Sequence, residues 1–557
     1  MIKYLATFIS LSTALLLSCA DGDTSQIRLV LNTLEDRQGS VTTGVGTLQV
    51  TPYDVVSGQI RGTQTFDLSA RQGALPSLPI GTWKLLIEGS ANNVPFYGAT
   101  TQFTVDENEA FVVQALLGRA NCIGKLPPQQ VAQEFSTGKL SLPNGFVGQG
   151  VVELPSGDFL ITGGGLLNES DGRINGVSNA IFLYSHTLGL IYDTGKVLNV
   201  GRAFHQATLL SDGQVLITGG VSSVQGGAYF AEESAELISA DFTGKTPLEW
   251  SVVSQVVVNS VGAGKRFNHS ATRLKDGTVL LIGGQSDNGA FLKSTSRYFP
   301  TEGIFRVQGD LNQSKAFHSV SRLNRQYDQL AVIGGLNELG ANKDVEVFTT
   351  NPMASCTPRP DGNTGCFSRV AELNRPRWGH GSALIERPPT LIDGAPWVDN
   401  SVIIAGGFGS GDETTPADPL SPVELFEISN GNPSVRDNLA NLSTARGNVG
   451  YTGLPDGSLI LMGGRTVGSS NQVTRITPTV NTQQTPPTVN LAVEEHCQLS
   501  EGRYGAQAIL NQDGAVVLIG GIKKGTNQAG VVVNLPSKAV ELLYGTISPK
   551  AVWGGSL

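Results

Sequence analysis

The stretch RAFHQATLLSDGQVLITGG, residues 202–220, decides the fold because the chain repeats its order of residue types. RFNHSATRLKDGTVLLIGG follows at 266–284, RGNVGYTGLPDGSLILMGG at 446–464 and RYGAQAILNQDGAVVLIGG at 503–521. Each copy holds a basic residue, an apolar strand, an Asp-Gly turn and a second apolar strand that ends in Gly-Gly. Because glycine adopts positive φ angles without steric cost, Asp-Gly between two strands predicts a β-hairpin.

The Gly-Gly signal extends this unit along most of the chain. Seven apolar runs end in Gly-Gly pairs, spaced by 51 to 72 residues, whose second glycines are Gly164, Gly220, Gly284, Gly335, Gly407, Gly464 and Gly521. A third apolar strand follows each pair, as in AIFLYS at 180–185, and a fourth precedes the basic residue, as in IYDTGKVL at 191–198. Four strands repeated seven times indicate a closed array of small sheets.

This pattern resembles the Kelch repeats of the β-propeller superfamily that includes galactose oxidase, and the resemblance covers about residues 130 to 548. It implies an all-β fold with a seven-bladed Kelch-type β-propeller over residues 119–557. We expect the segment QEFSTGKLSL, residues 133–142, to complete the last blade and remove the open sheet edge.

Residues 27–118 lack the repeat but alternate apolar and polar side chains as strands do. LPIGTWKLLIEG, residues 78–89, resembles the strand-turn-strand of transthyretin-like or immunoglobulin-like domains. We therefore expect a small β-sandwich before the propeller.

The first residues are typical of an exported protein. Lys3 precedes an apolar run from Leu5 to Leu17, which is too short to span a bilayer and predicts a signal peptide over residues 1–18. The ending Leu16-Leu17-Ser18-Cys19 resembles a bacterial lipobox, which implies lipidation of Cys19, a tether over 19–26 and, with Ala20 next, the outer membrane. An ordinary secretory signal with an incidental cysteine is the alternative.

Four further cysteines suggest two disulfides in an exported chain. Cys356 and Cys366 flank one short loop and are expected to pair. Cys122 and Cys497 are the remaining pair, if the fold brings them together.

The composition argues against a nucleic-acid partner, because 38 basic residues face 47 acidic ones and the net charge is −9. The four histidines His205, His269, His318 and His380 follow the repeat, each three residues after a basic one. Ligands that converge on one ion should break a repeat, so we predict no metal and no other cofactor. The two Tyr and two His that bind copper in radical oxidases resembling galactose oxidase find no match outside the repeat.

The repeated basic residue is the candidate binding feature, since it falls on the connection into each blade in six of seven copies. One interpretation is structural, with each side chain bonded to backbone carbonyls between blades. The other is a ring of donors at the channel mouth that binds carboxylates or other anions. The six residues are Arg202, Arg266, Lys315, Arg377, Arg446 and Arg503.

Together these patterns predict a monomeric, lipid-anchored envelope protein whose propeller binds a protein, peptide or glycan without catalysis. The alternative is a Kelch-fold enzyme acting on sugars or small metabolites, although no hydrolase, zinc-protease or P-loop motif occurs. Specificity should lie in the longer insertions between repeats. These are 165–179, 350–367, 386–400, 409–420 and 468–489.

Overall fold

The structure of the chain is a computed structural model, and it is all-β. No helix within its described residues is long and apolar enough to cross a membrane. Cys19 and the rest of the tether lie outside these residues. The structure describes residues 16–17, 27–33, 35–36, 39–40, 46–67, 72–73, 78–100, 103–105, 111–119, 123–124, 138–139, 147–170, 172–185, 190–241, 251–257, 260–324, 328–350, 365–386, 400–429, 431–484, 487–512, 514–526 and 531–543.

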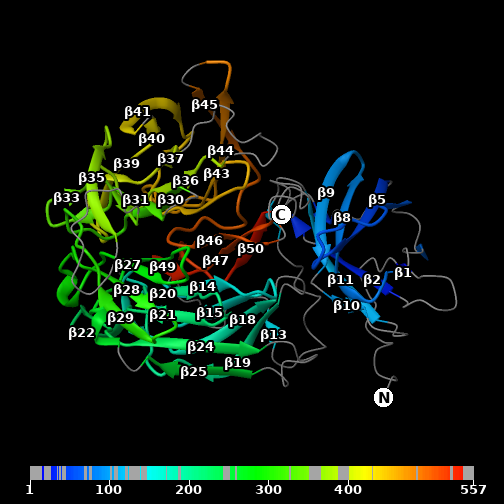
Figure 1. Ribbon diagram of the computed structural model, residues 1–557, viewed down its shortest axis with the longest axis horizontal. Coiled ribbons are helices and arrows are strands. Elements are labelled where there is room, and N and C mark those ends of the chain that lie inside the picture. Colours follow the sequence, from blue (N-terminus) through cyan, green and yellow to red (C-terminus); the bar gives the residue numbers. More distant parts are fainter. Residues whose placement is uncertain are drawn as a thin grey trace.

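Seven four-stranded antiparallel units surround one axis, and their first strands face each other at the centre (Figure 1). Blades one to three comprise β14 (Gly150–Glu153), β15 (Phe159–Thr162), β18 (Ala180–Ser185), β19 (Leu190–Val197); β20 (Gln206–Leu209), β21 (Val215–Thr218), β24 (Ala235–Asp241), β25 (Ser251–Val256); β26 (Ser270–Arg273), β27 (Val279–Ile282), β28 (Thr295–Phe299) and β29 (Ile304–Val307). Blades four and five comprise β30 (Ser319–Asn324), β31 (Gln329–Ile333), β34 (Asp344–Thr349), β35 (Cys366–Glu372); β36 (Gly381–Leu384), β37 (Val402–Ala405), β40 (Pro422–Ser429) and β41 (Asn432–Asn441). Blades six and seven comprise β42 (Gly450–Gly453), β43 (Leu459–Met462), β44 (Val473–Asn481), β45 (Thr488–Glu495); β46 (Gln507–Leu510), β47 (Val516–Ile519), β50 (Val540–Leu543) and β12 (Ile123–Gly124).

The seven-bladed Kelch-type propeller is therefore confirmed. The Asp-Gly hairpins form as expected, and Gly213, Gly277 and Gly457 adopt φ angles of 85°, 83° and 80°. The second strands are buried along their whole length in six blades, and at every residue but Gln329 in blade four, because neighbouring blades cover both of their faces. One apolar cluster, for example, joins Leu160 and Leu183 of blade one to Val215 and Ile217 of blade two.

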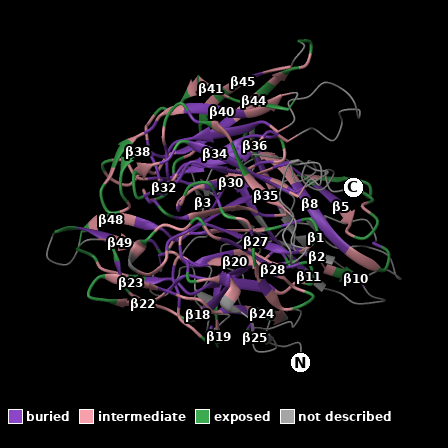
Figure 2. Ribbon diagram, turned by 60° about the vertical axis from the view of Figure 1, so that its left-hand side comes forward, coloured by how far each residue is buried: buried purple, intermediate pink, exposed green. Residues whose placement is uncertain are grey.

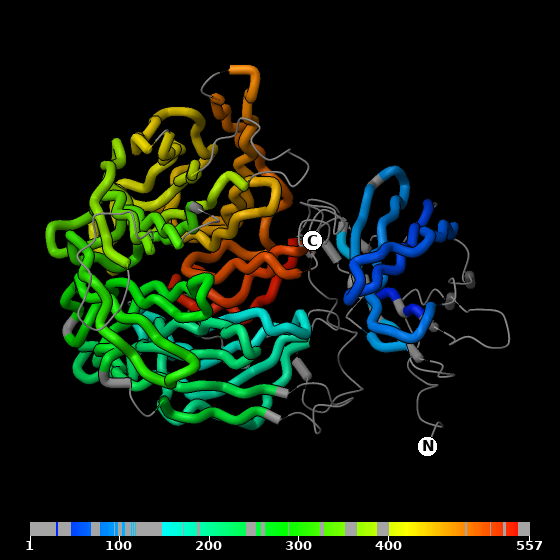
Figure 3. The backbone as a smooth tube through the Cα atoms, in the orientation of Figure 1, coloured from blue at the N-terminus to red at the C-terminus, as the bar shows by residue number. Residues whose placement is uncertain are grey.

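The ring closes through the early part of the chain, but not through the expected segment. β12 pairs antiparallel with β50 and supplies the outer strand of blade seven. β13 (Gly138–Lys139), which lies within 133–142, instead pairs with β19 as a fifth strand of blade one. Blade one and blade seven lie side by side, in cyan and red (Figure 3). Closure was predicted correctly and its strand wrongly, because a two-residue strand has no readable periodicity.

In five blades a two-stranded hairpin follows directly after Gly-Gly, before the third strand. All five leave from the same end of the second strands, and the labelled ones in Figure 2 lie away from the N-terminal sheet. They are β16 (Gly165–Leu167) with β17 (Ile174–Val177), β22 (Val221–Gln225) with β23 (Ala228–Ala231), β32 (Leu336–Asn337) with β33 (Gly340–Ala341), β38 (Phe408–Gly411) with β39 (Pro416–Pro419), and β48 (Ile522–Thr526) with β49 (Val532–Pro536).

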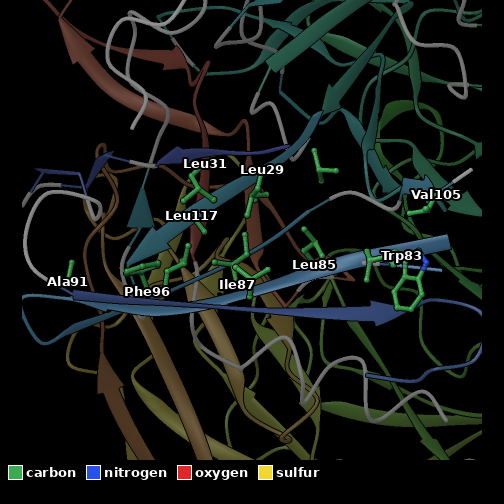
Figure 4. Close-up of a cluster of buried hydrophobic side chains, with 14 residues drawn as sticks. Leu29, Leu31, Trp83, Leu85, Ile87, Ala91, Phe96, Val105 and Leu117 are labelled. Atoms are coloured by element: carbon green, nitrogen blue, oxygen red, sulfur yellow. The ribbon is translucent and has the colours of Figure 1, made fainter. Parts of the chain in front are cut away.

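The N-terminal unit is one sheet that curls around its own core. Its strand order is β2 (Ile27–Thr33), β11 (Phe111–Arg119), β9 (Val94–Thr100), β8 (Gly81–Ala91), β5 (Gly46–Asp54) and β6 (Gln64–Asp67), with β10 (Phe103–Val105) also on β8. Leu29 and Leu31 reach the core from one side, and Trp83, Leu85 and Ile87 from the other (Figure 4). The two halves of the sheet thus face each other, as in the sandwich packing expected. Two short pairs lie outside this sheet: β1 (Leu16–Leu17) with β7 (Gln72–Gly73), and β3 (Glu35–Asp36) with β4 (Gly39–Ser40).

Candidate functional site

The six repeated basic residues are buried in the scaffold and do not form a ligand-binding ring. Their side chains are only 0–2% exposed, so a ligand at the channel mouth has no access to them. This corrects the binding interpretation of the sequence. The residues concerned are Arg202, Arg266, Lys315, Arg377, Arg446 and Arg503.

Arg202 shows what these side chains do. Its Nη1 donates hydrogen bonds to the carbonyls of Gly219 and Ser234 at 3.0 and 2.9 Å, and its Nη2 contacts Glu236 Oε1 at 2.6 Å. Its own carbonyl accepts a hydrogen bond from the Gly164 N–H of the preceding blade at 2.8 Å. The second glycine of each of the first six Gly-Gly pairs donates to the next basic residue in this way. The repeated basic residue and Gly-Gly therefore fasten blade to blade.

A buried glutamate in the third strand pairs with four of these cations, which the sequence reasoning missed. Besides Arg202 with Glu236, the pairs are Lys315 with Glu346 at 2.8 Å, Arg377 with Glu424, and Arg503 with Glu541 at 2.6 Å. The sequence does contain a signal for these pairs, because the glutamates stand at matching places in AELIS, VEVFT, VELFE and VELLY.

Blade three departs from this pairing. Ser296 of β28 stands where four other blades hold glutamate, and Arg266 bonds to the carbonyls of Ala263, Gly283 and Ser294. Burial lowers the pKa of Arg266 to about 10, and the charge of Asp310 opposes that shift only in part.

The four repeated histidines also join neighbouring blades. Each shares a hydrogen bond between its Nε2 and a hydroxyl of the preceding blade, at 2.8 to 3.1 Å. Burial first, and the nearby Arg202 second, lower the pKa of His205 to about 3, so the ring is neutral near pH 7. The structural interpretation of the histidines therefore holds. The pairs are His205 with Thr162, His269 with Thr218, His318 with Ser270, and His380 with Ser319.

Two positions after each basic residue, and at the equivalent place in blade one, the chain forms a ring around the axis, which we call the mouth ring. All seven of its residues adopt φ angles between 48° and 65°. Backbone hydrogen bonds link neighbours, for example from Phe204 N–H to the Gly148 carbonyl at 2.6 Å and from Asn448 N–H to that of Gly379 at 2.8 Å. The mouth ring consists of Gly148, Phe204, Asn268, Phe317, Gly379, Asn448 and Gly505.

The mouth ring forms the floor of a cavity of about 570 Å³ on the hairpin face. The hairpins and the residues after Gly-Gly build its walls. A backbone bridge in every blade ties wall to floor, such as Ala203 with Val221 or Tyr504 with Ile522. The insertions 165–179 and 409–420 contribute to the lining, as expected for specificity loops. The insertion 468–489 contributes no described residue to it.

Cations do line this cavity, although they are not the expected ones. Arg173, Arg465 and Lys524 supply the positive charge. Arg173 lies over the ring of Tyr229 and Arg465 over that of Tyr504, each 5.3 Å from the ring centroid. Such cation–π contacts hold a guanidinium in place. These residues could be found in the sequence only as positions in the insertion or just after Gly-Gly.

The tip of the β38–β39 hairpin reaches across the cavity mouth. Glu413 Oε1 accepts a hydrogen bond from Gln285 Nε2 of blade three at 3.1 Å, and the Thr414 carbonyl accepts one from Arg465 Nη2 of blade six at 3.3 Å. Burial raises the pKa of Glu413, and the Gln285 bond and Arg173 oppose that rise. The hairpin of blade five thus places one carboxyl group beside the cavity cations.

Copper oxidase chemistry does not fit these residues. The cavity histidines His205, His318 and His380 bond to hydroxyls of the scaffold, and Cys366 and Cys497 are disulfide-bonded, so neither thiol is free for a link to tyrosine. Among the described residues, no three His, Cys, Asp or Glu side chains group as metal ligands do. The predicted partners Cys356 and Cys122 lie outside the described residues, so both disulfide pairings stay predictions.

Solved structures similar to this chain include two at low sequence identity. A fungal alcohol oxidase of the AA5 family, solved with copper, matches with a TM-score of 0.46 and 17% identity over 72% of this chain and 77% of that one. The structure of YjhT matches with a TM-score of 0.41 and 15% identity over 64% of this chain and 99% of that one. At these identities the likeness concerns the fold alone. No family model and no curated protein matches the chain.

Proposed function

We propose that the protein is a lipid-anchored bacterial envelope protein that binds a saccharide in the propeller cavity without converting it. The observation that carries this is the lining, where aromatic rings, amides and fixed cations meet in about 570 Å³. A sugar ring offers an apolar face of C–H bonds and a rim of hydroxyls, which these groups match. A peptide strand would more commonly add to an open sheet edge.

The remaining parts of the proposal come from the sequence. Lipidation of Cys19 would hold the protein at the outer membrane, and the N-terminal sheet would stand between anchor and propeller. In the view of Figure 2 the labelled hairpin strands lie on the side of the propeller away from that sheet, which would turn the cavity away from the membrane. We expect the protein to act as a monomer. Cys19→Ser should release the protein from envelope membranes.

Calorimetry with soluble disaccharides tests the binding. We expect at least one to bind the full mature protein, and Arg465→Gln to weaken that binding while proton NMR shows no turnover. Arg436→Gln is the matched control, because Arg436 contacts Glu427 on the outer strands of blade five. Failure of every disaccharide, or equal loss in both variants, would refute the proposal.

A sugar-converting enzyme is the second candidate, and Glu413 is the observation that favours it. A carboxyl group with a raised pKa beside a binding cavity suits a general acid. Against this, Glu413 is the one carboxylate among the described lining residues, whereas acid–base catalysis on sugars commonly needs two groups. Turnover that Glu413→Gln abolishes, or stoichiometric copper in the purified protein, would replace the binding proposal.

A further inference from the structure

Two members of the mouth ring carry a residue that its backbone disfavours. Phe204 and Phe317 adopt φ angles of 57° and 54°. A bulky side chain is rarely found in this left-handed region, because its β-carbon crowds the backbone. The other five members are glycine or asparagine, the residues that tolerate it best. Blades two and four therefore hold phenylalanine at a position where the other five blades hold glycine or asparagine.

The scaffold alone does not account for these phenylalanines. Phe204 N–H bonds to the Gly148 carbonyl, and the Phe204 carbonyl accepts from Asn268 N–H, as at ring positions that hold glycine or asparagine. Any residue supplies those backbone groups. Strain of this kind persists where the surrounding structure enforces it, and it gathers at ligand clamps.

Both side chains are supported from behind and open to the cavity. The ring of Phe204 lies so close over Gly148 that a β-carbon there would come within 2.4 Å of it. Phe317 packs against Trp378, with 5.7 Å between ring centroids. Both phenylalanines are half-buried, and both line the cavity. Each ring is thus held firmly and keeps part of its surface toward the cavity.

We propose that Phe204 and Phe317 are the stacking residues that select a pyranose ring with an exposed C–H face. This rests on the proposed saccharide binding and adds the chemical class of ligand. Asn268 lies between them in the ring and is held by a hydrogen bond from its Nδ2 to Gln285 Oε1 at 3.0 Å, beside the hairpin that carries Glu413. The apolar face and the hydroxyl rim of a pyranose thus meet separate groups.

The test separates strain from stacking by using two replacements at one site. Phe204→Asn and Phe317→Asn remove the ring and introduce a residue that tolerates the left-handed conformation, whereas Phe204→Ala removes the ring and introduces one that tolerates it poorly. The probes are cellobiose and N,N′-diacetylchitobiose, with sorbitol as the control that has hydroxyls but no ring face. Asn438→Gly is the matched control, because Asn438 also adopts a left-handed φ angle, 53°, but does not line the cavity.

We expect both asparagine variants to raise the Kd of the bound probe by about tenfold, as loss of an aromatic anchor commonly does. Their thermal midpoints should stay equal to or above that of the unchanged protein, and Phe204→Ala should melt below Phe204→Asn. Asn438→Gly should alter neither Kd nor midpoint.

Four results would overturn the proposal. If neither probe binds the unchanged protein, the saccharide proposal itself fails, and this one with it. If a probe binds and both asparagine variants bind it equally well, only the stacking role fails. A midpoint several degrees lower in both asparagine variants would show that the rings serve packing, and sorbitol binding as tight as that of the disaccharides would exclude selection of a ring face.

Discussion

The propeller holds two sets of cations that a sequence cannot tell apart by residue type. Arg202, Arg377 and their equivalents follow the repeat and are fully buried against carbonyls and glutamates. Arg173 and Arg465 break the repeat, sit on the hairpin side and line the cavity. A side chain in register with the repeat meets the same neighbours in each blade and serves the scaffold. The groups available to a ligand arise where the copies differ.

The largest effect that separates the two sets should come from a buried pair. Glu424→Ala leaves Arg377 charged and buried without its carboxylate, and removes the acceptor of the Asn374 N–H at 2.8 Å. Breaking such a pair costs about 3–5 kcal/mol. Denaturant unfolding monitored by tryptophan fluorescence measures this loss.

Glu302→Ala is the control, because Glu302 pairs with Arg306 on an exposed turn of blade three. Exposed pairs contribute about 0–1 kcal/mol. Equal losses in the two variants would contradict the scaffold role assigned to the buried set.

Acid should destabilise the protein through the scaffold histidines. The pKa of His205 is about 3 in the folded chain and 6.5 ordinarily, so between these values only the unfolded chain binds the proton. Stability is then fully present above pH 6.5 and falls as the pH drops toward 3. At pH 4.5 this difference in the pKa of His205 lowers the free energy of unfolding by about 2–3 kcal/mol.

His205→Gln should flatten this pH dependence, because glutamine does not titrate. The chain already uses that replacement, since Gln149 stands at the equivalent place in blade one and bonds the Ile519 carbonyl at 3.3 Å. Thermal midpoints between pH 4 and 8 measure the slope, and an unchanged slope would remove His205 from the acid response.

A smaller difference in stability should separate the buried arginine of blade three from that of blade two. Arg266→Met leaves carbonyls unpaired, whereas Arg202→Met also leaves the buried carboxylate of Glu236 without its cation. We expect Arg202→Met to cost about 1–3 kcal/mol more, the penalty of one unsatisfied buried group. Parallel urea titrations give the difference. A greater loss for Arg266→Met would mean that the carboxylate is not what sets the cost.

The repeat made the blades predictable, because it is a local pattern sampled seven times. The predicted third strand AIFLYS at 180–185 matches β18 in full. The turn glycines Gly213, Gly277 and Gly457 adopt the positive φ angles that their turns need. The closing strand could not be predicted from the sequence, because the two residues Ile123–Gly124 form a strand only through their pairing with β50. The cavity was equally hidden, because Arg173, Glu413 and Arg465 come together only through the hairpin geometry.

Arg465→Gln should cause the smallest loss of stability, and it tests a cation that lines the cavity. Arg465 is half-buried, lies over Tyr504 and bonds the Thr414 carbonyl, so its loss removes a surface contact and leaves no buried charge unpaired. The expected cost is about 0.5–1 kcal/mol. The same arginine-to-glutamine change at Arg377 should lower the free energy of unfolding by several times that amount, because Glu424 would lose its cation. If both variants unfold at the same denaturant concentration, burial is not what divides the two sets, and the cavity arginine must be counted with the scaffold.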